Sequence, residues 1–142
     1  ASMPIVTRPV KVDDGRLMLD GGISDSIPLE YFRKCGFEKN VVVLTQPRDY
    51  RKAPAPKWLF RLLMPHEPAI AMAMGRRHLM YNSQLDYLAA QEESGSTLVI
   101  APEAPLRIGR TESDSSKMLQ TYRIGRETAA GNLDRIRQFC FQ

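Results

Sequence analysis

Apolar residues along the chain form two short continuous runs, separated by a longer stretch with helical spacing. Residues 41–44 and 97–100 are rich in β-branched side chains, as in strands that are covered on both faces. Between them, residues 68–91 place apolar side chains on or near one helix face, although Gly75 could interrupt the helix. This order predicts an α/β fold containing a βαβ unit, with parallel strands near 41–45 and 97–101 and a right-handed crossover.

Two further helices are expected. A short one should follow Ser26, which can cap it, and end before Gly36, with a buried face that includes Cys35. A C-terminal amphipathic helix should start near Ser113 or Asp114 and pack on the sheet. Two glycines weaken this helix and mark a kink or a break: Gly125 and Gly131. At this length, residues 1–142 are expected to be a single domain or a fragment of one.

Composition narrows the choice of partners. The net charge of +4 suits anionic lipid, and no RNA-binding or helix-turn-helix motif supports a nucleic-acid partner. The sequence shows no signal peptide and no apolar run long enough to span a membrane, so we expect a cytoplasmic protein with at most peripheral membrane contact. Cys35 and Cys140 lie far apart without a nearby histidine cluster, which predicts buried free thiols and no metal or cofactor site.

The strongest candidate for chemistry is Asp20, which follows the short apolar run Leu17-Met18-Leu19. Gly21 and Gly22 come next and can adopt positive φ angles, which would turn the chain sharply. Asp20 would then lie exposed at the C-terminal end of a strand, where α/β proteins place their active sites. Any tight turn also uses Asp-Gly-Gly, so these three residues alone leave a catalytic and a structural role open.

A longer pattern surrounds this segment. It consists of Ala1-Ser2-Met3-Pro4, Pro9-Val10, Gly15, Leu19-Asp20-Gly21-Gly22 and Asp25-Ser26-Ile27-Pro28, followed by the run VVVLTQPRDYRK at 41–52 and by Arg77, Tyr81 and Asn82. The pattern resembles the region around the catalytic aspartate of the patatin-like phospholipases, in particular their bacterial branch. The resemblance implies that the chain is the C-terminal part of an α/β/α hydrolase. It also implies that Asp20 is the aspartate of a Ser-Asp dyad and that Gly21 and Gly22 complete its motif.

Two motifs of those enzymes are absent from the sequence: the G-x-S-x-G nucleophile elbow and the Gly-rich oxyanion loop. The nearest approach is Gly22-Ile23-Ser24-Asp25-Ser26, which lacks the closing glycine. We therefore expect a fragment, produced by design or proteolysis, whose N-terminal remainder supplies both motifs; a cloning remnant before Met3 is the alternative. The resemblance implies that the missing serine attacks a phospholipid or other acyl ester while Asp20 accepts its proton, without a cofactor. The chain alone would be inactive.

A second hypothesis comes from residues 57–64 (KWLFRLLM), where aromatic and aliphatic residues alternate with cations. The segment could lie in a membrane interface, but a short helix buried against the sheet is favoured because eight residues anchor weakly. The chain would then be a non-catalytic α/β module that binds a partner or a membrane surface. His66 and His78 are expected at the solvated surface, and Ser24 and Ser26 in turns or caps.

Overall fold

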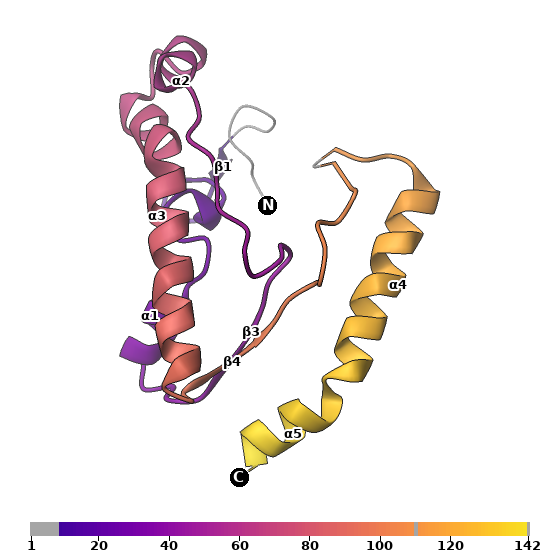
Figure 1. Ribbon diagram of the computed structural model, residues 1–142. Coiled ribbons are helices and arrows are strands. Elements are labelled where there is room, and N and C mark those ends of the chain that lie inside the picture. Colours follow the sequence, from indigo (N-terminus) through magenta and orange to yellow (C-terminus); the bar gives the residue numbers. More distant parts are fainter. Residues whose placement is uncertain (1–8, 110, 142) are drawn as a thin grey trace. The chain divides into compact units, whose positions relative to one another are not determined.

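The computed structural model describes residues 9–109 and 111–141 (Figure 1). The chain divides into two compact units. The first unit combines the chain up to Pro28 with Arg51–Tyr87, and the second combines Leu29–Tyr50 with the chain from Leu88 onward. Helix α3 (Pro68–Glu93) contributes residues to both units and is not interrupted at Gly75. In the part of the chain that is described, no helix is both long and apolar enough to cross a membrane.

The first unit holds a small antiparallel hairpin and a helical corner. Strands β1 (Val10–Lys11) and β2 (Leu17–Met18) pair antiparallel, and Gly15 takes a φ of 84° in the turn between them. The 3-10 turn η1 (Gly21–Ile23) follows β2, and helix α2 (Lys57–Leu63) precedes α3. The buried apolar residues of this unit are Ile27, Ala71 and Leu85.

The second unit contains the predicted parallel strand pair. Strands β3 (Asn40–Val43) and β4 (Thr97–Ile100) run side by side, with Asn40 opposite Thr97 and Val43 opposite Ile100 (Figure 1). The mixed α/β class and the positions of both strands are thereby confirmed. All four residues of β4 are buried, as expected for a strand covered on both faces. For β3 this expectation is wrong, because Val41 and Val43 are 36% and 71% exposed.

Helix α1 (Leu29–Lys34) ends as the sequence predicts but begins differently. Gly36 has a φ of 93° and donates from its amide to the Arg33 carbonyl, while the Phe37 amide donates to the Phe32 carbonyl. These two bonds form a Schellman motif, and the Phe32 and Phe37 rings lie 5.7 Å apart across it. Ser26 is not the cap, because its hydroxyl donates to the carbonyl of Gly22.

The C-terminal region consists of two helices, α4 (Ser115–Gly131) and α5 (Leu133–Phe141). Asp114 caps α4 by accepting from the Ser116 amide at 2.9 Å, and the break after Gly131 confirms one of the two predicted positions. The predicted packing of an apolar helix face on the sheet is wrong, since neither helix has a buried residue among those described. The expected burial of the thiols is also wrong, because Cys35 and Cys140 are both free and exposed.

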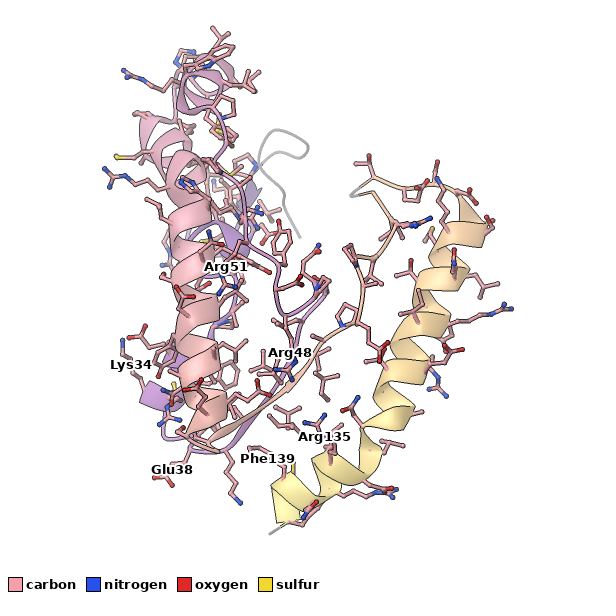
Figure 2. The ribbon with its side chains drawn as sticks, viewed as in Figure 1. Lys34, Glu38, Arg48, Arg51, Arg135 and Phe139 are labelled. Atoms are coloured by element: carbon pink, nitrogen blue, oxygen red, sulfur yellow. The ribbon has the colours of Figure 1, made fainter. Side chains whose placement is uncertain are left out.

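An ion pair closes the outer side of β4. Glu92, in the last turn of α3, accepts from the guanidinium of Arg48 and from the Val99 amide, the latter at 3.3 Å. Arg48, which is labelled in Figure 2, also donates to the Val99 carbonyl at 2.7 Å. The hydrogen bond from Arg48 lowers the pKa of Glu92 below its ordinary value of 4.5.

The pKa of Glu92 predicts a pH dependence of stability. A carboxyl whose pKa is lower in the folded than in the unfolded state contributes stability above about pH 4.5, and this contribution is lost as the pH falls through the folded-state value. Glu92→Gln should therefore lower the free energy of unfolding at pH 7 by about 1 kcal/mol or less, as for partly exposed ion pairs, and flatten the acid limb of the stability curve. Urea unfolding between pH 3 and pH 7 measures both. Glu93→Gln, at an exposed position one residue later, should leave the curve unchanged. Equal acid limbs in the wild type and Glu92→Gln would contradict this account.

Candidate functional site

Asp20 lies immediately after β2 and acts as the N-terminal cap of η1. Its side chain is half-buried, and the Oδ1 atom accepts a hydrogen bond from the Gly22 amide at 2.8 Å. For the other carboxylate oxygen, Oδ2, the described residues provide no hydrogen bond. One oxygen thus fixes the carboxylate to its own turn, while the other remains available as an acceptor.

The reason expected for the two glycines is wrong. Neither Gly21 nor Gly22 has a positive φ, because both lie in the 3-10 turn. Gly22 lies instead where space is tight: a Cβ there would lie 3.1 Å from Asp20 Oδ1 and 3.4 Å from Nη2 of Arg77. At Gly21 a Cβ would meet open space. The close approach of two side chains to the backbone therefore favours glycine at the second position and leaves room for a side chain at the first.

The position of Asp20 relative to a sheet also differs from the prediction. β2 belongs to the antiparallel hairpin with β1 and is not a strand of the parallel pair. Asp20 therefore does not lie at the carboxyl end of a parallel strand, where active sites form in α/β proteins.

Two side chains of α3 hold the turn that follows Asp20. Arg77 donates from Nε to the Gly22 carbonyl at 2.8 Å, and Ser26 Oγ donates to the same oxygen at 2.7 Å. Gln84 accepts from the amides of Ser26 and Ile27 at 3.2 and 3.1 Å, and its Nε2 donates to Asp25. Arg77 and Gln84 are seven residues apart, so they share one face of the helix. The sequence interpretation did not assign these roles; the polar i, i+7 spacing on an otherwise apolar face is the signal that could have found them.

The serines of this region take part in turns, as predicted. Ser24 Oγ donates to the Gly21 carbonyl at 3.3 Å, and Ser26 is engaged with Gly22. Within residues 9–109 and 111–141, no hydrogen bond joins Asp20 to a serine hydroxyl. The Asp20 carboxylate is therefore held in position, but these residues place no serine nucleophile beside it.

The predicted basic loop packs on α3. The Lys52 amide donates to Asn82 at 2.8 Å, and Asn82 returns a hydrogen bond to the Lys52 carbonyl. Lys52 Nζ lies over the Tyr81 ring at 5.3 Å, and Arg51 pairs with Asp86 at 3.0 Å. The residues that resembled a family pattern in α3, Tyr81 and Asn82, thus anchor the loop that leads into α2.

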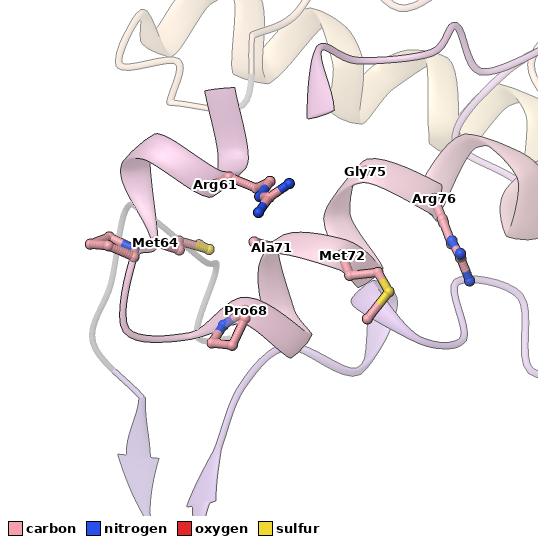
Figure 3. A pocket seen from close by; sticks show the side chains of 8 residues that line it. Arg61, Met64, Pro68, Ala71, Met72, Gly75 and Arg76 are labelled. Atoms are coloured by element: carbon pink, nitrogen blue, oxygen red, sulfur yellow. The ribbon is translucent and has the colours of Figure 1, made fainter. Parts of the chain in front are cut away.

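Of the segment 57–64, residues 57–63 form α2 and Met64 is its C-cap, and Arg61 and Met64 line a pocket of about 600 Å³. In Figure 3, Arg61 and Met64 extend from this side of the pocket toward Ala71 and Gly75 of α3. Trp58 and Leu62 are 68% and 69% exposed, so the favoured expectation of a buried helix is wrong for them.

The histidines do not join Asp20 in a triad. His66 is exposed, as expected, whereas His78 is half-buried and its Nδ1 has no hydrogen-bond partner among the described residues. The same residues contain no group of three His, Cys, Asp or Glu side chains arranged to bind a metal.

Comparison with known proteins assigns the chain to a family. Residues 67–141, from the start of α3 to the end of α5, match the domain of unknown function DUF6363. No curated protein and no solved structure matches the chain. The assignment to the patatin-like phospholipases is therefore wrong: the family found is a different one, and its match includes Arg77 and Gln84 but not Asp20. The chain belongs to the DUF6363 family.

Proposed function

We propose that this chain supplies the general base, Asp20, of a Ser-Asp acyl hydrolase that acts on lipid or other acyl esters. The observation that carries the proposal concerns the Asp20 carboxylate: the Gly22 amide donates to Oδ1 at 2.8 Å, and Oδ2 has no hydrogen bond from residues 9–109 or 111–141. The serine and the oxyanion-binding amides would come from polypeptide outside these 142 residues, because the sequence contains no nucleophile elbow.

The chemistry requires little from Asp20 beyond position. A serine hydroxyl within hydrogen-bond reach would transfer its proton to Oδ2 while its oxygen attacks the ester carbonyl. Amide donors would stabilise the oxyanion, and the departing alcohol would take the proton from Asp20. Water would then release the acyl group, with Asp20 again accepting a proton. No step requires a cofactor.

The hydrogen bonds from α3 explain how Asp20 could hold that position. General-base catalysis loses efficiency when the base moves, because the proton must transfer over a short, aligned distance. Arg77 holds the Gly22 carbonyl and Gln84 holds the next two amides, so the turn that orients Asp20 is fixed at two places. Arg77 and Gln84 are positioning residues in this proposal.

The proposal predicts the effect of Asp20→Asn in the full gene product that contains these residues. Asn keeps the size of the side chain and the hydrogen bond from Gly22, but it cannot accept the serine proton, so kcat should fall about a hundredfold or more. Hydrolysis of a short-chain p-nitrophenyl ester measures kcat, and thermal unfolding should show little change.

Asp25→Asn is the matched control, because Asp25 lies in the same turn region and its carboxylate accepts a hydrogen bond from Gln84 only, among the described residues. It should keep kcat within about twofold, as expected for a residue outside the reaction. Residues 1–142 alone should give only the background rate. A folded Asp20→Asn protein with near-normal kcat would return Asp20 to the role of a turn residue.

A second candidate function, as a non-catalytic module at a membrane surface, is favoured by the exposure of α2. Trp58, Leu62 and Leu63 are exposed on this helix, and Arg61 lies among them. Such a mixture of exposed apolar side chains and cations suits the interface of an anionic bilayer. In this candidate the protein would be cytoplasmic and bind the membrane from its surface.

Replacing Trp58 and Leu62 together by Ser should then weaken binding to phosphatidylglycerol vesicles at least about tenfold, because two large apolar side chains leave the interface. Co-sedimentation with vesicles measures the binding, and phosphatidylcholine vesicles give the charge-independent part. Because both side chains are exposed, the variant should stay folded. The double substitution Leu79→Ser and Met118→Ser, at exposed sites outside α2, is the control. Unchanged binding by the Trp58/Leu62 variant would remove this candidate.

A further inference from the structure

The two edges of the β3–β4 pair differ in their backbone hydrogen bonds. On the β3 side of the pair, the Asn40 amide donates to the Ser96 carbonyl at 3.1 Å and the Leu44 amide donates to the Ile100 carbonyl at 2.8 Å. Because the direction of backbone groups alternates along a strand, the amides and carbonyls of Val41 and Val43 point to the opposite edge. Among the described residues no strand other than β4 pairs with β3, so this edge is open.

The outer edge of β4 is closed. At Val99 the amide donates to Glu92 and the carbonyl accepts from Arg48, so side chains take both positions that a neighbouring strand would use. The ion pair between Arg48 and Glu92 holds these two side chains in place. A strand that extends the sheet can therefore be added beside β3 but not beside β4.

The residues of β3 lack the charge and the proline that often protect a sheet edge in monomeric proteins. Such edges commonly carry a charge, a proline or a bulge that prevents pairing with another chain. β3 reads Asn-Val-Val-Val, without a charge or a proline, and Val41 and Val43 present their side chains to solvent on one face. Parallel sheets are normally covered on both faces, and two strands are few for a stable sheet.

We infer that the edge of β3 binds a parallel β-strand of the polypeptide that supplies the nucleophilic serine, an inference that rests on the proposed function. A parallel strand is joined to its sheet neighbours through a helix, and that helix can cover the face formed by Val41 and Val43. One strand and its helix thus satisfy both the unpaired backbone and the exposed side chains. A second copy of this chain, paired antiparallel across a two-fold axis, would satisfy the backbone alone.

Hydrogen exchange at single amides tests the inference. In residues 1–142 alone, the Val41 and Val43 amides should exchange rapidly, while the Val42 amide, which points to β4, should be protected. In the full gene product the Val41 and Val43 amides should slow by a hundredfold or more, on the order expected for amides that join a sheet core. NMR with selectively labelled valine measures all three exchange rates.

Rapid exchange of Val41 and Val43 in the gene product would overturn the inference. Protection that appears in residues 1–142 with rising concentration, together with a dimer in sedimentation, would overturn it in favour of a second copy.

A charged substitution gives an independent readout. Val43→Lys should leave the melting temperature of residues 1–142 nearly unchanged, because the side chain is 71% exposed there. In the gene product it should lower the melting temperature by several degrees, since the charge would be buried beneath the helix that covers this face. Val43→Thr, which keeps the β-branched shape, is the matched control. Equal effects of Val43→Lys in both proteins would contradict the inference.

The two proposals can fail separately. Asp20→Asn should leave the protection of Val41 and Val43 intact, because Asp20 has no part in the sheet. If this variant keeps its activity while the two amides remain protected, the catalytic proposal is wrong and the inference of an added strand is supported. If the amides are unprotected while Asp20→Asn loses activity, the inference of an added strand is wrong and the catalytic proposal is supported.

Discussion

The carbonyl oxygen of Gly22 is the point on which the candidate site depends. It accepts hydrogen bonds from Arg77 and from Ser26 at 2.8 and 2.7 Å, while the amide of the same residue donates to Asp20. A single peptide segment therefore links a carboxylate to a helix of 26 residues. The absence of a Cβ at Gly22 permits this arrangement, because a side chain there would crowd both Asp20 and Arg77.

Helix α3 supplies polar side chains to both units of the chain. Arg77 and Gln84 hold the Asp20 turn in the first unit, and Glu92, two turns further along, completes the outer edge of β4 in the second. In each case a helix side chain replaces a backbone partner that a turn or a strand would otherwise lack. The family match begins at residue 67 and so includes all three side chains.

The sequence predicted the regular elements better than the site. Hydrophobic spacing located β3, β4, α3 and the break after Gly131, because these features depend on local periodicity and on glycine. It could not predict that Val41 and Val43 would lie exposed, since coverage of a strand depends on elements distant in the sequence or outside it. It also failed for the helices α4 and α5, whose apolar spacing is real but whose expected buried face is absent from the described residues.

At the site, the motif identified Asp20 as a residue of interest but gave the wrong physical reason for the glycines. A positive φ and a close side-chain approach both select glycine, and the sequence cannot distinguish them. The roles of Arg77 and Gln84 depend on contacts across about 55 to 60 positions of the chain. The resemblance, which was most specific around Asp20, also led to an incorrect family, because turn residues such as Asp, Gly and Pro recur in unrelated proteins.

The central claim is that Asp20 is held in position for a serine that these residues do not contain. A crystal structure of the full gene product tests it most directly, through the distance from the Asp20 carboxylate to the nearest serine Oγ. The account predicts a serine hydroxyl at about 2.6–3.2 Å from Oδ2, with the hydrogen bond from Gly22 retained at Oδ1. An Asp20 carboxylate that faces solvent, or whose Oδ2 is bound only by backbone amides of its own turn, would contradict it.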